Sequence, residues 1–420
     1  MKRVVVTGLG VVAPNGINVP EFRKAIESGK SGVRFSTELE LLRSGCQVAG
    51  LPNFESNVLN EYFTSNTLRN LNSTGVQYGC AAAIEAWLDA GLQVGEQVVD
   101  LDAGCVFGSA LPDLSFGSEL ISKAVASNGA RIGTRYIEQI MGSGTGAYIT
   151  GLLGLGNYSV ATSVACATGT EAILNAANRI RAGFAKRMLA GSNEATDAYT
   201  WFAFDGMGVT NKYSNNDAGG ASMPMSQHAK GFIPGAGAGA LILEDLEVAL
   251  ARGARIYAEI KGGWTSSGGG RNGGTMTANS FEGMVWCIKR AMLDAEVDPG
   301  DIDLICGHLT STKGDVKEVQ AWAEALGRRG SDFPVINSLK SMIGHCLGAA
   351  GSIECVAAVL QLHRSFIHPS INCQLPHQEI IDLIDEQRIP QHILKRQMKV
   401  VAKANFGFGD VSSCIFFSGI

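Results

Sequence analysis

The chain has 420 residues, of which 45% are hydrophobic and 17% charged, and its net charge of −5 supplies no overall basic field for nucleic acid. Its length suffices for a large buried core, while no apolar run is long enough to span a bilayer and the N-terminus does not resemble a signal peptide. Ten cysteines without paired spacing predict a reduced, cytoplasmic protein.

Strand-like and helix-like segments alternate in the first half, as in α/β proteins. The patterns predict a strand and turn at residues 1–10, helices at 22–29 and 79–92, and strands at 105–110, 187–195 and 239–245. An irregular stretch is expected from Thr200 to about Gly231. No low-complexity linker follows, so we predict two packed halves, residues 1–250 and 251–420.

Cys166 lies where an apolar, β-branched run stops and a helical apolar period begins. The period is carried by Ile173, Leu174, Ala177 and Ile180. The free N–H groups and positive dipole end of a helix favour thiolate over thiol, and the thiolate is the stronger nucleophile. The pattern therefore predicts that Cys166 is a nucleophile.

The second half appears in the sequence as a repeat of the first. Residues 254–263 resemble the opening strand, a helix is predicted at 283–295, and residues 333–365 repeat the strand, polar turn and helix around Cys166. In this repeat His345 stands near the place that Cys166 holds. Two similar halves would bring the two turns face to face, so we expect Cys166 to meet His345.

A third group of polar residues follows the short apolar strand that ends at His308. Thr310, Ser311 and Thr312 come directly after this histidine. Polar groups at the end of a buried strand in an α/β protein are where ligands usually bind. We therefore expect His308 to join Cys166 and His345 in one site.

These motifs resemble those of the β-ketoacyl-[acyl-carrier-protein] synthases I and II of the thiolase superfamily. The similarity extends nearly from end to end and includes VVVTGLGVVAPNG, ACATGTEAIL, FDGMGVTNKYS, GFIPGAGAGALILEDLEVALARGA, KSMIGHCLGAAGSIE and NFGFGD. The resemblance implies an α/β, thiolase-like fold in which two similar βαβ halves form a five-layered α-β-α-β-α core, in a dimer.

The resemblance also implies the chemistry. Cys166 would accept an acyl chain from a carrier-protein thioester, and His308 and His345 would contact the malonyl thioester and stabilise the enolate that forms when carbon dioxide leaves. The enolate would then attack the acyl group in a decarboxylative Claisen condensation, in fatty acid or polyketide synthesis, polyenes included. No cofactor and no metal are expected.

Other residues are assigned by their match to the family motifs. Lys340 and Glu354 would form an orienting ion pair. Thr310 and Thr312 would bind the phosphopantetheine arm. Phe406 is expected among the substrate-binding residues, as is Phe408, whose backbone N–H would form an oxyanion hole with that of Cys166. The stretch from Ala110 to Gly142 is expected to contribute to the acyl pocket.

Two loops depart from the family pattern. Leu309 replaces a glycine after the first histidine, and Lys313 stands in a loop that is one residue short. Asp410, Val411 and Ser412 replace the usual residues, among them a glycine, after the phenylalanine motif. A carboxylate and a β-branched residue restrict a loop that glycine would leave free, so we expect a specialised synthase with altered gating or chain selection.

A dinucleotide-binding oxidoreductase is an alternative, because Gly8, Gly10 and Ala13 fit the G-x-G-x-x-A fingerprint. That fingerprint requires a helix to begin at this point, and the following Pro14, Asn15 and Gly16 oppose one. A tight turn that packs the first strand is the better interpretation.

A second alternative is a non-catalytic, chain-length-determining subunit that pairs with an active synthase. In such subunits the nucleophile is usually no longer cysteine, whereas Cys166 remains here. The residues favour an active enzyme but leave open a homodimer or a heterodimer with a related subunit. The expected partner is an acidic acyl carrier protein, which would require a local basic patch at the entrance.

Overall fold

A computed structural model of the chain describes residues 1–95, 98–127 and 135–420. The elements of the first half are β1 (Val4–Val12), α1 (Val19–Ser28), β2 (Val33–Phe35), α2 (Thr37–Leu41), β3 (Val48–Gly50), α3 (Ser65–Leu68), α4 (Thr74–Asp89), β4 (Ala103–Gly108), α5 (Leu114–Ala126), α6 (Arg135–Ile140), α7 (Gly144–Leu153), β5 (Ser159–Val160), α8 (Thr168–Arg181), β6 (Arg187–Glu194), α9 (Ala198–Gly206), β7 (Gly237–Asp245) and α10 (Leu246–Ala251).

The second half begins with β8 and ends with β14. Its elements are β8 (Ala258–Ser267), α11 (Phe281–Ala295), β9 (Ile302–Cys306), α12 (Gly314–Leu326), β10 (Val335–Asn337), α13 (Lys340–Ile343), α14 (Ala350–Arg364), β11 (Phe366–Ile367), α15 (Gln378–Ile381), β12 (Leu394–Lys395), β13 (Val400–Gly407) and β14 (Val411–Ser418). Short 3₁₀ turns lie at Ser56–Leu59, Pro299–Asp301, Leu347–Ala349 and Glu386–Arg388.

Each half of the chain contributes a sheet, and the two sheets have the same topology. The strand order is β5-β4-β6-β7-β1 in the first half and β10-β9-β13-β14-β8 in the second. In each, the first two neighbouring pairs are parallel and the last two antiparallel. The two sheets join where Val4–Val6 pairs with Ala258–Ile260. The predicted repeat is confirmed, and we propose that the halves divide between residues 250 and 251.

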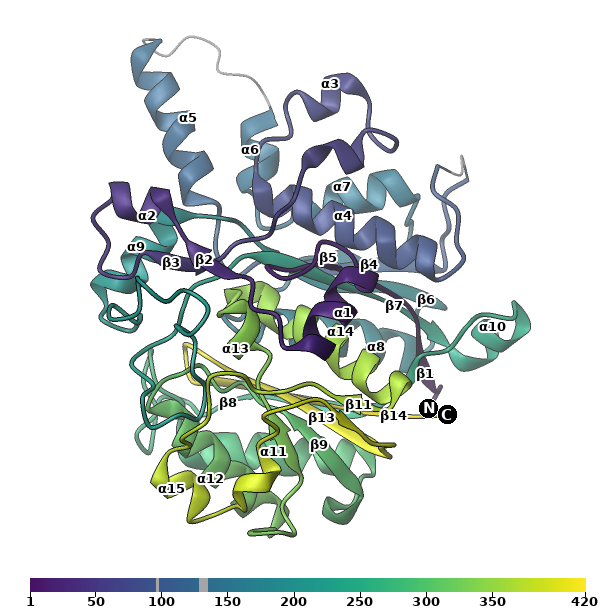
Figure 1. Cartoon of the computed structure of the whole chain (residues 1–420). Helices are drawn as coiled ribbons and strands as arrows, with labels where there is room; N and C mark the ends of the chain where they lie inside the picture. Colours follow the sequence, from purple (N-terminus) through teal and green to yellow (C-terminus); the bar gives the residue numbers. More distant parts are fainter. Residues whose placement is uncertain (96–97, 128–134) are drawn as a thin grey trace.

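Helices separate the two sheets and cover their outer faces (Figure 1). Helices α4 and α7 pack on the outer face of the first sheet, α8 and α14 lie between the sheets, and α11 and α12 pack on the outer side of the second. Helix α14 is buried from Ala350 to Leu362, as expected of a helix enclosed on all sides. The five layers implied by the resemblance are confirmed.

Small residues allow α8 and α14 to meet closely between the sheets. A Cβ at Gly169 would lie 2.3 Å from the backbone nitrogen of Ser352, and a Cβ at Gly351 would lie 2.5 Å from that of Thr170. These distances are too short for any side chain. The glycines therefore set the distance between the two helices whose N-terminal ends carry the site.

The glycines of β1 serve packing. A Cβ at Gly8 would lie 2.1 Å from the carbonyl oxygen of Ala86, and one at Gly10 would lie 1.9 Å from that of Ala82, both on α4. Helix α1 begins only at Val19, well after the glycines. The fingerprint thus lacks the helix that a dinucleotide site requires, and the interpretation as a tightly packed strand is confirmed.

One expectation about local structure is wrong. The stretch expected to be irregular from Thr200 begins within α9 (Ala198–Gly206). Asp197 caps this helix by accepting hydrogen bonds from the backbone N–H groups of Tyr199 and Thr200. The sequence did not predict this helix, because its apolar residues are distributed all around the helix axis and form no single stripe.

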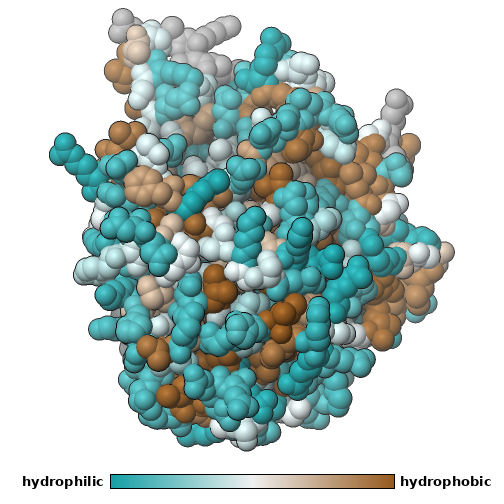
Figure 2. Space-filling view, in the orientation of Figure 1, coloured by the Kyte–Doolittle hydropathy of each residue, from teal (hydrophilic) through white to brown (hydrophobic). Residues whose placement is uncertain are grey.

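Polar side chains cover most of the face shown in Figure 2, with apolar side chains scattered among them. Apolar side chains gather over α10, where Leu250 is exposed. Within the part of the chain that the structure describes, no helix is both long and apolar enough to cross a membrane.

Candidate active site

The internal repeat brings Cys166 and His345 to corresponding places. Cys166 lies between β5 and α8, two residues before the helix begins, and His345 lies between β10 and α14. His308 follows β9 at the same end of the second sheet. Since α8 and α14 pack against each other, the loops at their N-terminal ends meet. The three residues predicted to converge from distant parts of the sequence do so.

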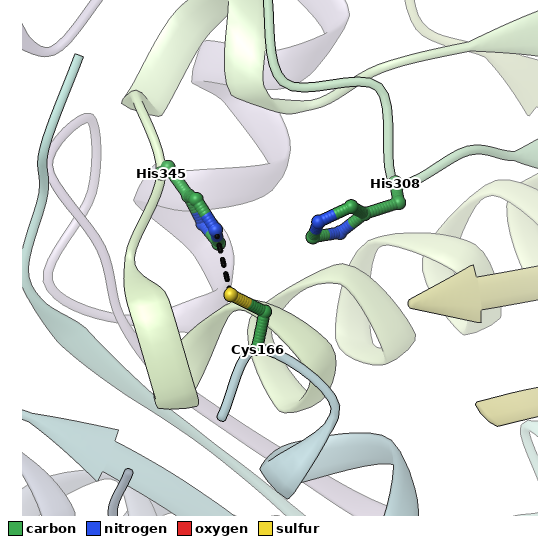
Figure 3. A group of neighbouring side chains, drawn as sticks. All are labelled: Cys166, His308 and His345. Atoms are coloured by element: carbon green, nitrogen blue, oxygen red, sulfur yellow. Dashed lines mark hydrogen bonds between the residues drawn. The ribbon is translucent and has the colours of Figure 1, made fainter. Parts of the chain in front are cut away.

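The three side chains face a common space (Figure 3). The Nε2 atom of His345 lies 3.1 Å from the Sγ atom of Cys166. The rings of His308 and His345 have centroids 5.2 Å apart and are nearly perpendicular, at 82°. Potential ligand atoms of the three residues lie within 4.8 Å of one another, a set that could hold a zinc ion. The absence of a metal, which the resemblance implies, stays a prediction.

Loss of contact with water governs the protonation of the three groups, of which the two histidines are buried and Cys166 is half-buried. It raises the pKa of the Cys166 thiol to about 11, although the Lys340 ammonium and a hydrogen bond from the backbone N–H of Phe408 act in the opposite direction. Burial, with the charge of Lys340, also holds the pKa values of His308 and His345 well below the ordinary value. The resting group is therefore a neutral thiol with two neutral imidazoles, contrary to the thiolate expected from the helix N-terminus.

The three residues line a cavity of about 770 Å³. Four other residues predicted to bind substrate also line it: Thr310, Thr312, Phe406 and Phe408. The hydroxyl oxygens of Thr310 and Thr312 lie 3.0 Å apart, so the shortened loop still brings both to the cavity.

Comparison with known proteins identifies the family. Residues 1–249 match the family described as "Beta-ketoacyl synthase, N-terminal domain", and residues 257–374 match "Beta-ketoacyl synthase, C-terminal domain". This chain belongs to the β-ketoacyl synthase family. It is 33% identical to a 3-oxoacyl-[acyl-carrier-protein] synthase 2 of Vibrio harveyi, over 100% of this chain and 99% of the relative.

Solved structures of ketosynthases share the fold. One is a type II polyketide synthase acyl-carrier protein in complex with its ketosynthase bound to the hexaketide (TM-score 0.88, 31% identity, 100% of both chains covered). Another is the ishigamide ketosynthase/chain length factor (TM-score 0.88, 26% identity, 100% of this chain and 99% of that chain covered).

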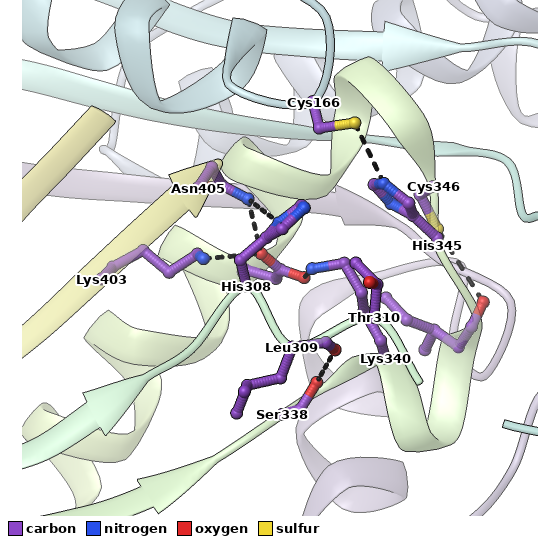
Figure 4. A network of polar contacts seen from close by, with 12 residues as sticks. Cys166, His308, Leu309, Thr310, Ser338, Lys340, His345, Cys346, Lys403 and Asn405 are labelled. Carbon is purple, nitrogen blue, oxygen red and sulfur yellow. Dashed lines mark hydrogen bonds and ion pairs between the residues drawn. The ribbon is translucent and has the colours of Figure 1, made fainter. Parts of the chain in front are cut away.

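In this β-ketoacyl synthase the predicted Lys340–Glu354 ion pair is present and buried. It belongs to a larger network, of which the sequence predicted only this pair (Figure 4). Lys403 places its Nζ atom 2.8 Å from Oε2 of Glu354, and Asn405 contacts both Glu354 and His308. The sequence did contain a signal for this network: a lysine and an asparagine stand two residues apart in an otherwise apolar, buried strand.

Two carboxylates of α12 hold the loop that carries His308. Glu318 accepts hydrogen bonds from the backbone N–H groups of His308 and Leu309, at 2.6 and 2.7 Å. Asp315 accepts from those of Thr310 and Ser311, at 2.7 and 3.1 Å. These bonds keep Leu309 at a φ of 24°, a conformation unusual for a residue other than glycine. The departure from the family glycine is thus accommodated by strain.

Asp410 anchors the loop after Phe408 through hydrogen bonds. This carboxylate is buried and accepts hydrogen bonds from the backbone N–H of Ser280 at 2.7 Å and of Gly270 at 3.1 Å. Asp410 itself has a φ of 58°. The expected restriction of this loop therefore has a physical basis, which is attachment to the segment between β8 and α11.

Glu194, at the end of β6, fixes another wall of the cavity. Its carboxylate accepts hydrogen bonds from the backbone N–H groups of Ala110, Leu111 and Gly348, at 3.3, 3.3 and 2.8 Å. Of the described residues in the stretch from Ala110 to Gly142, which was expected to contribute to the pocket, Ala110 and Leu111 line the cavity. Residues 128–134 of that stretch lie outside the described residues.

Proposed function

We propose that this β-ketoacyl synthase is a 3-oxoacyl-[acyl-carrier-protein] synthase, an acyltransferase that condenses an acyl chain held on Cys166 with a malonyl thioester. The observation that carries the proposal is the 3.1 Å contact between Sγ of Cys166 and Nε2 of His345, with His308 beside it, in a cavity. A nucleophile and two N–H donors around one space are what acyl transfer followed by enolate stabilisation requires.

In the first half-reaction the sulfur of Cys166 attacks the carbonyl carbon of the acyl thioester. Nε2 of His345 is close enough to take the thiol proton during the attack. The backbone N–H of Phe408, directed at Cys166, would help to hold the tetrahedral oxyanion together with that of Cys166. The phosphopantetheine thiol then leaves with the proton, and the acyl chain stays on Cys166.

In the second half-reaction the malonyl thioester loses carbon dioxide. The electron pair of the broken carbon–carbon bond forms an enolate. The negative charge on its oxygen would be stabilised by the N–H of His308 and by that of His345, after the single ring proton of His345 has moved from Nδ1 to Nε2. The enolate carbon attacks the acyl carbonyl, a new carbon–carbon bond forms, and Cys166 leaves as the thiolate, which takes a proton from water to restore the resting thiol. Thr310 and Thr312 would hold the phosphopantetheine arm during both steps, with Phe406 and Phe408 beside the substrate.

The partner we propose is an acyl carrier protein that delivers both thioesters. Support comes from the related ketosynthase solved with its acyl-carrier protein. The ten cysteines, all within the described residues, are unpaired, which suits a reducing compartment such as the cytoplasm.

A second candidate function is that of one subunit in a heterodimeric ketosynthase/chain-length-factor pair, catalytic or non-catalytic. It is favoured by the 26% identity to the ishigamide ketosynthase/chain length factor. The presence of Cys166, His308 and His345 in one site favours the catalytic subunit. The chain purified alone would then be inactive and would gain activity with a related subunit, whereas a homodimer would act alone.

The test is incubation of the purified protein with an acyl carrier-protein thioester and the malonyl thioester of the same carrier protein. The proposal predicts a 3-oxoacyl product elongated by two carbons, with one carbon dioxide released per product. Cys166→Ala, the matched control, should yield no condensation product. Equal product from wild-type protein and Cys166→Ala would contradict the proposal.

A further inference from the structure

A polar cluster lies beside His308 (Figure 4). Lys403 and Asn405 stand two residues apart on β13, so their side chains lie on the same face of the strand. That face meets α14, which supplies Glu354. Lys403, Asn405 and Glu354 are all buried, and the carboxylate of Glu354 contacts the other two.

The hydrogen bonds fix which way the amide of Asn405 points. Its Oδ1 atom accepts a hydrogen bond from the hydroxyl of Thr170 at 2.7 Å. Its Nδ2 atom lies 3.2 Å from Oε2 of Glu354, and an ionised carboxylate can only accept. Burial opposes ionisation of Glu354, but the ammonium groups of Lys340 and Lys403 outweigh it and lower the pKa of this carboxyl.

The second hydrogen of the same amide nitrogen is directed at His308. Nδ2 of Asn405 lies 3.2 Å from Nδ1 of His308. An amide nitrogen can only donate, so Nδ1 must be the unprotonated ring nitrogen. Because burial keeps the pKa of His308 far below neutrality, the ring carries one proton, which then resides on Nε2.

We propose that Asn405 is a positioning residue that holds His308 in the tautomer with its proton on Nε2, while Thr170, Glu354 and Lys403 fix the orientation of the Asn405 amide. Nδ1 is turned toward Asn405, so Nε2 is the nitrogen left to face the cavity that His308 lines. The role of the Nε2–H group of His308 as a donor rests on the proposed function, because an enolate oxygen is stabilised by a hydrogen-bond donor and not by a lone pair.

The first test reads the tautomer directly and does not depend on activity. In ¹⁵N NMR spectra of the full chain labelled at histidine, His308→Gln identifies the resonances of His308. The proposal predicts a protonated Nε2 and an unprotonated Nδ1 in the wild-type protein. Asn405→Asp, whose carboxylate accepts, should move the proton to Nδ1. Protonation at Nδ1 in the wild-type protein, or the same single tautomer in Asn405→Ala, which has no donor for Nδ1, would overturn the proposal.

The second test separates the two half-reactions and uses Asn405→Ala as well, since Asn405→Asp places two carboxylates side by side. Loss of a correctly directed donor costs on the order of 10²-fold or more, so decarboxylation of the malonyl thioester by Asn405→Asp should slow by about that factor. For Asn405→Ala, in which both tautomers become accessible, the expected loss is about tenfold. Acylation of Cys166 should change little in both variants.

The matched control is Asn337→Ala. Asn337 is also a buried asparagine of the second sheet, and its amide bonds to Gln361 and to the backbone of His368 instead of the site. If Asn405→Ala slows acylation and decarboxylation in equal proportion, as a general loss of structure would, the proposal is wrong. If the wild-type protein neither loads an acyl chain nor decarboxylates malonyl thioester, the proposed function fails, and the NMR result still decides the role of Asn405.

Discussion

The protonation of Cys166 is decided by a competition between burial and positive charge. The sequence places the thiol before a helix, where the dipole favours the thiolate. In the folded protein the helix begins two residues later, and burial raises the pKa of the thiol to about 11. The sequence could not reveal this, because the burial arises from loops that are distant along the chain.

The first prediction concerns this pKa. The pKa of Cys166 lies near 11. At pH values below this pKa, the thiolate fraction increases about tenfold for each unit by which the pH is raised. The rate of Cys166 alkylation by iodoacetamide, followed by mass spectrometry, should therefore still be rising steeply between about pH 7 and pH 9. A rate that is already constant below pH 7 would mean that the helix N-terminus dominates.

The second prediction concerns Glu354, whose carboxylate pairs with both Lys340 and Lys403. Glu354→Gln leaves two buried ammonium groups facing each other, so the free energy of unfolding should fall by about 3–5 kcal/mol. Chemical denaturation measures this loss. Glu282→Gln, at an exposed position in the first turn of α11, is the control, with an expected loss of at most about 1 kcal/mol.

The pH dependence of that loss has a defined sign. The folded-state pKa of Glu354 lies below its ordinary value, so its stabilising contribution is present above the ordinary pKa and disappears as the pH falls through the lowered one. The difference between wild-type protein and Glu354→Gln should thus shrink in acid. A difference that is absent at neutral pH would show that the ion pairs contribute no net stability.

At the scale of elements, the strand and helix periods predicted most of the sheet and the internal repeat. The polar turns after β5, β9 and β10 could therefore be recognised from the sequence as parts of a site. The supporting contacts could not be predicted, because their partners are far apart in the sequence. Thr170 bonds to Asn405, and Asp410 bonds to Ser280. Helix α9 lacked an apolar stripe and was missed.

The third prediction tests the attachment of the loop after Phe408 to the segment between β8 and α11. Asp410→Gly removes the two hydrogen bonds to Ser280 and Gly270 and supplies a residue that accepts a positive φ without strain. We expect a looser loop and a changed distribution of product chain lengths, measured by mass spectrometry. Asp410→Asn keeps one of the two acceptor oxygens, enough for the bond to Ser280 but not for that to Gly270, and should give an intermediate profile. An unchanged profile in Asp410→Gly would refute this role.

At the scale of the whole molecule, the chain is mildly acidic, but exposed lysines line the cavity. Lys230 and Lys313 are exposed, and both line the cavity that contains Cys166. They are candidates for the basic patch expected at the entrance for an acidic carrier protein.

The fourth prediction follows from these lysines. Lys230→Glu combined with Lys313→Glu should lower kcat/KM for carrier-bound substrates by about tenfold at low salt, because long-range attraction becomes repulsion. The same variant should use acyl-pantetheine thioesters as the wild-type protein does. Lys24→Glu on α1, outside the cavity, is the control. Equal losses with both kinds of substrate would argue against carrier docking at these residues.

The internal repeat forms the site, because it brings a thiol from one half of the chain against two histidines from the other half. The most direct test of the account is mass spectrometry of the protein after incubation with a set of acyl carrier-protein thioesters and then with malonyl carrier protein. The account predicts an acyl adduct on Cys166 that malonyl thioester discharges. An adduct on another residue, or one on Cys166 that malonyl thioester leaves in place, would contradict it.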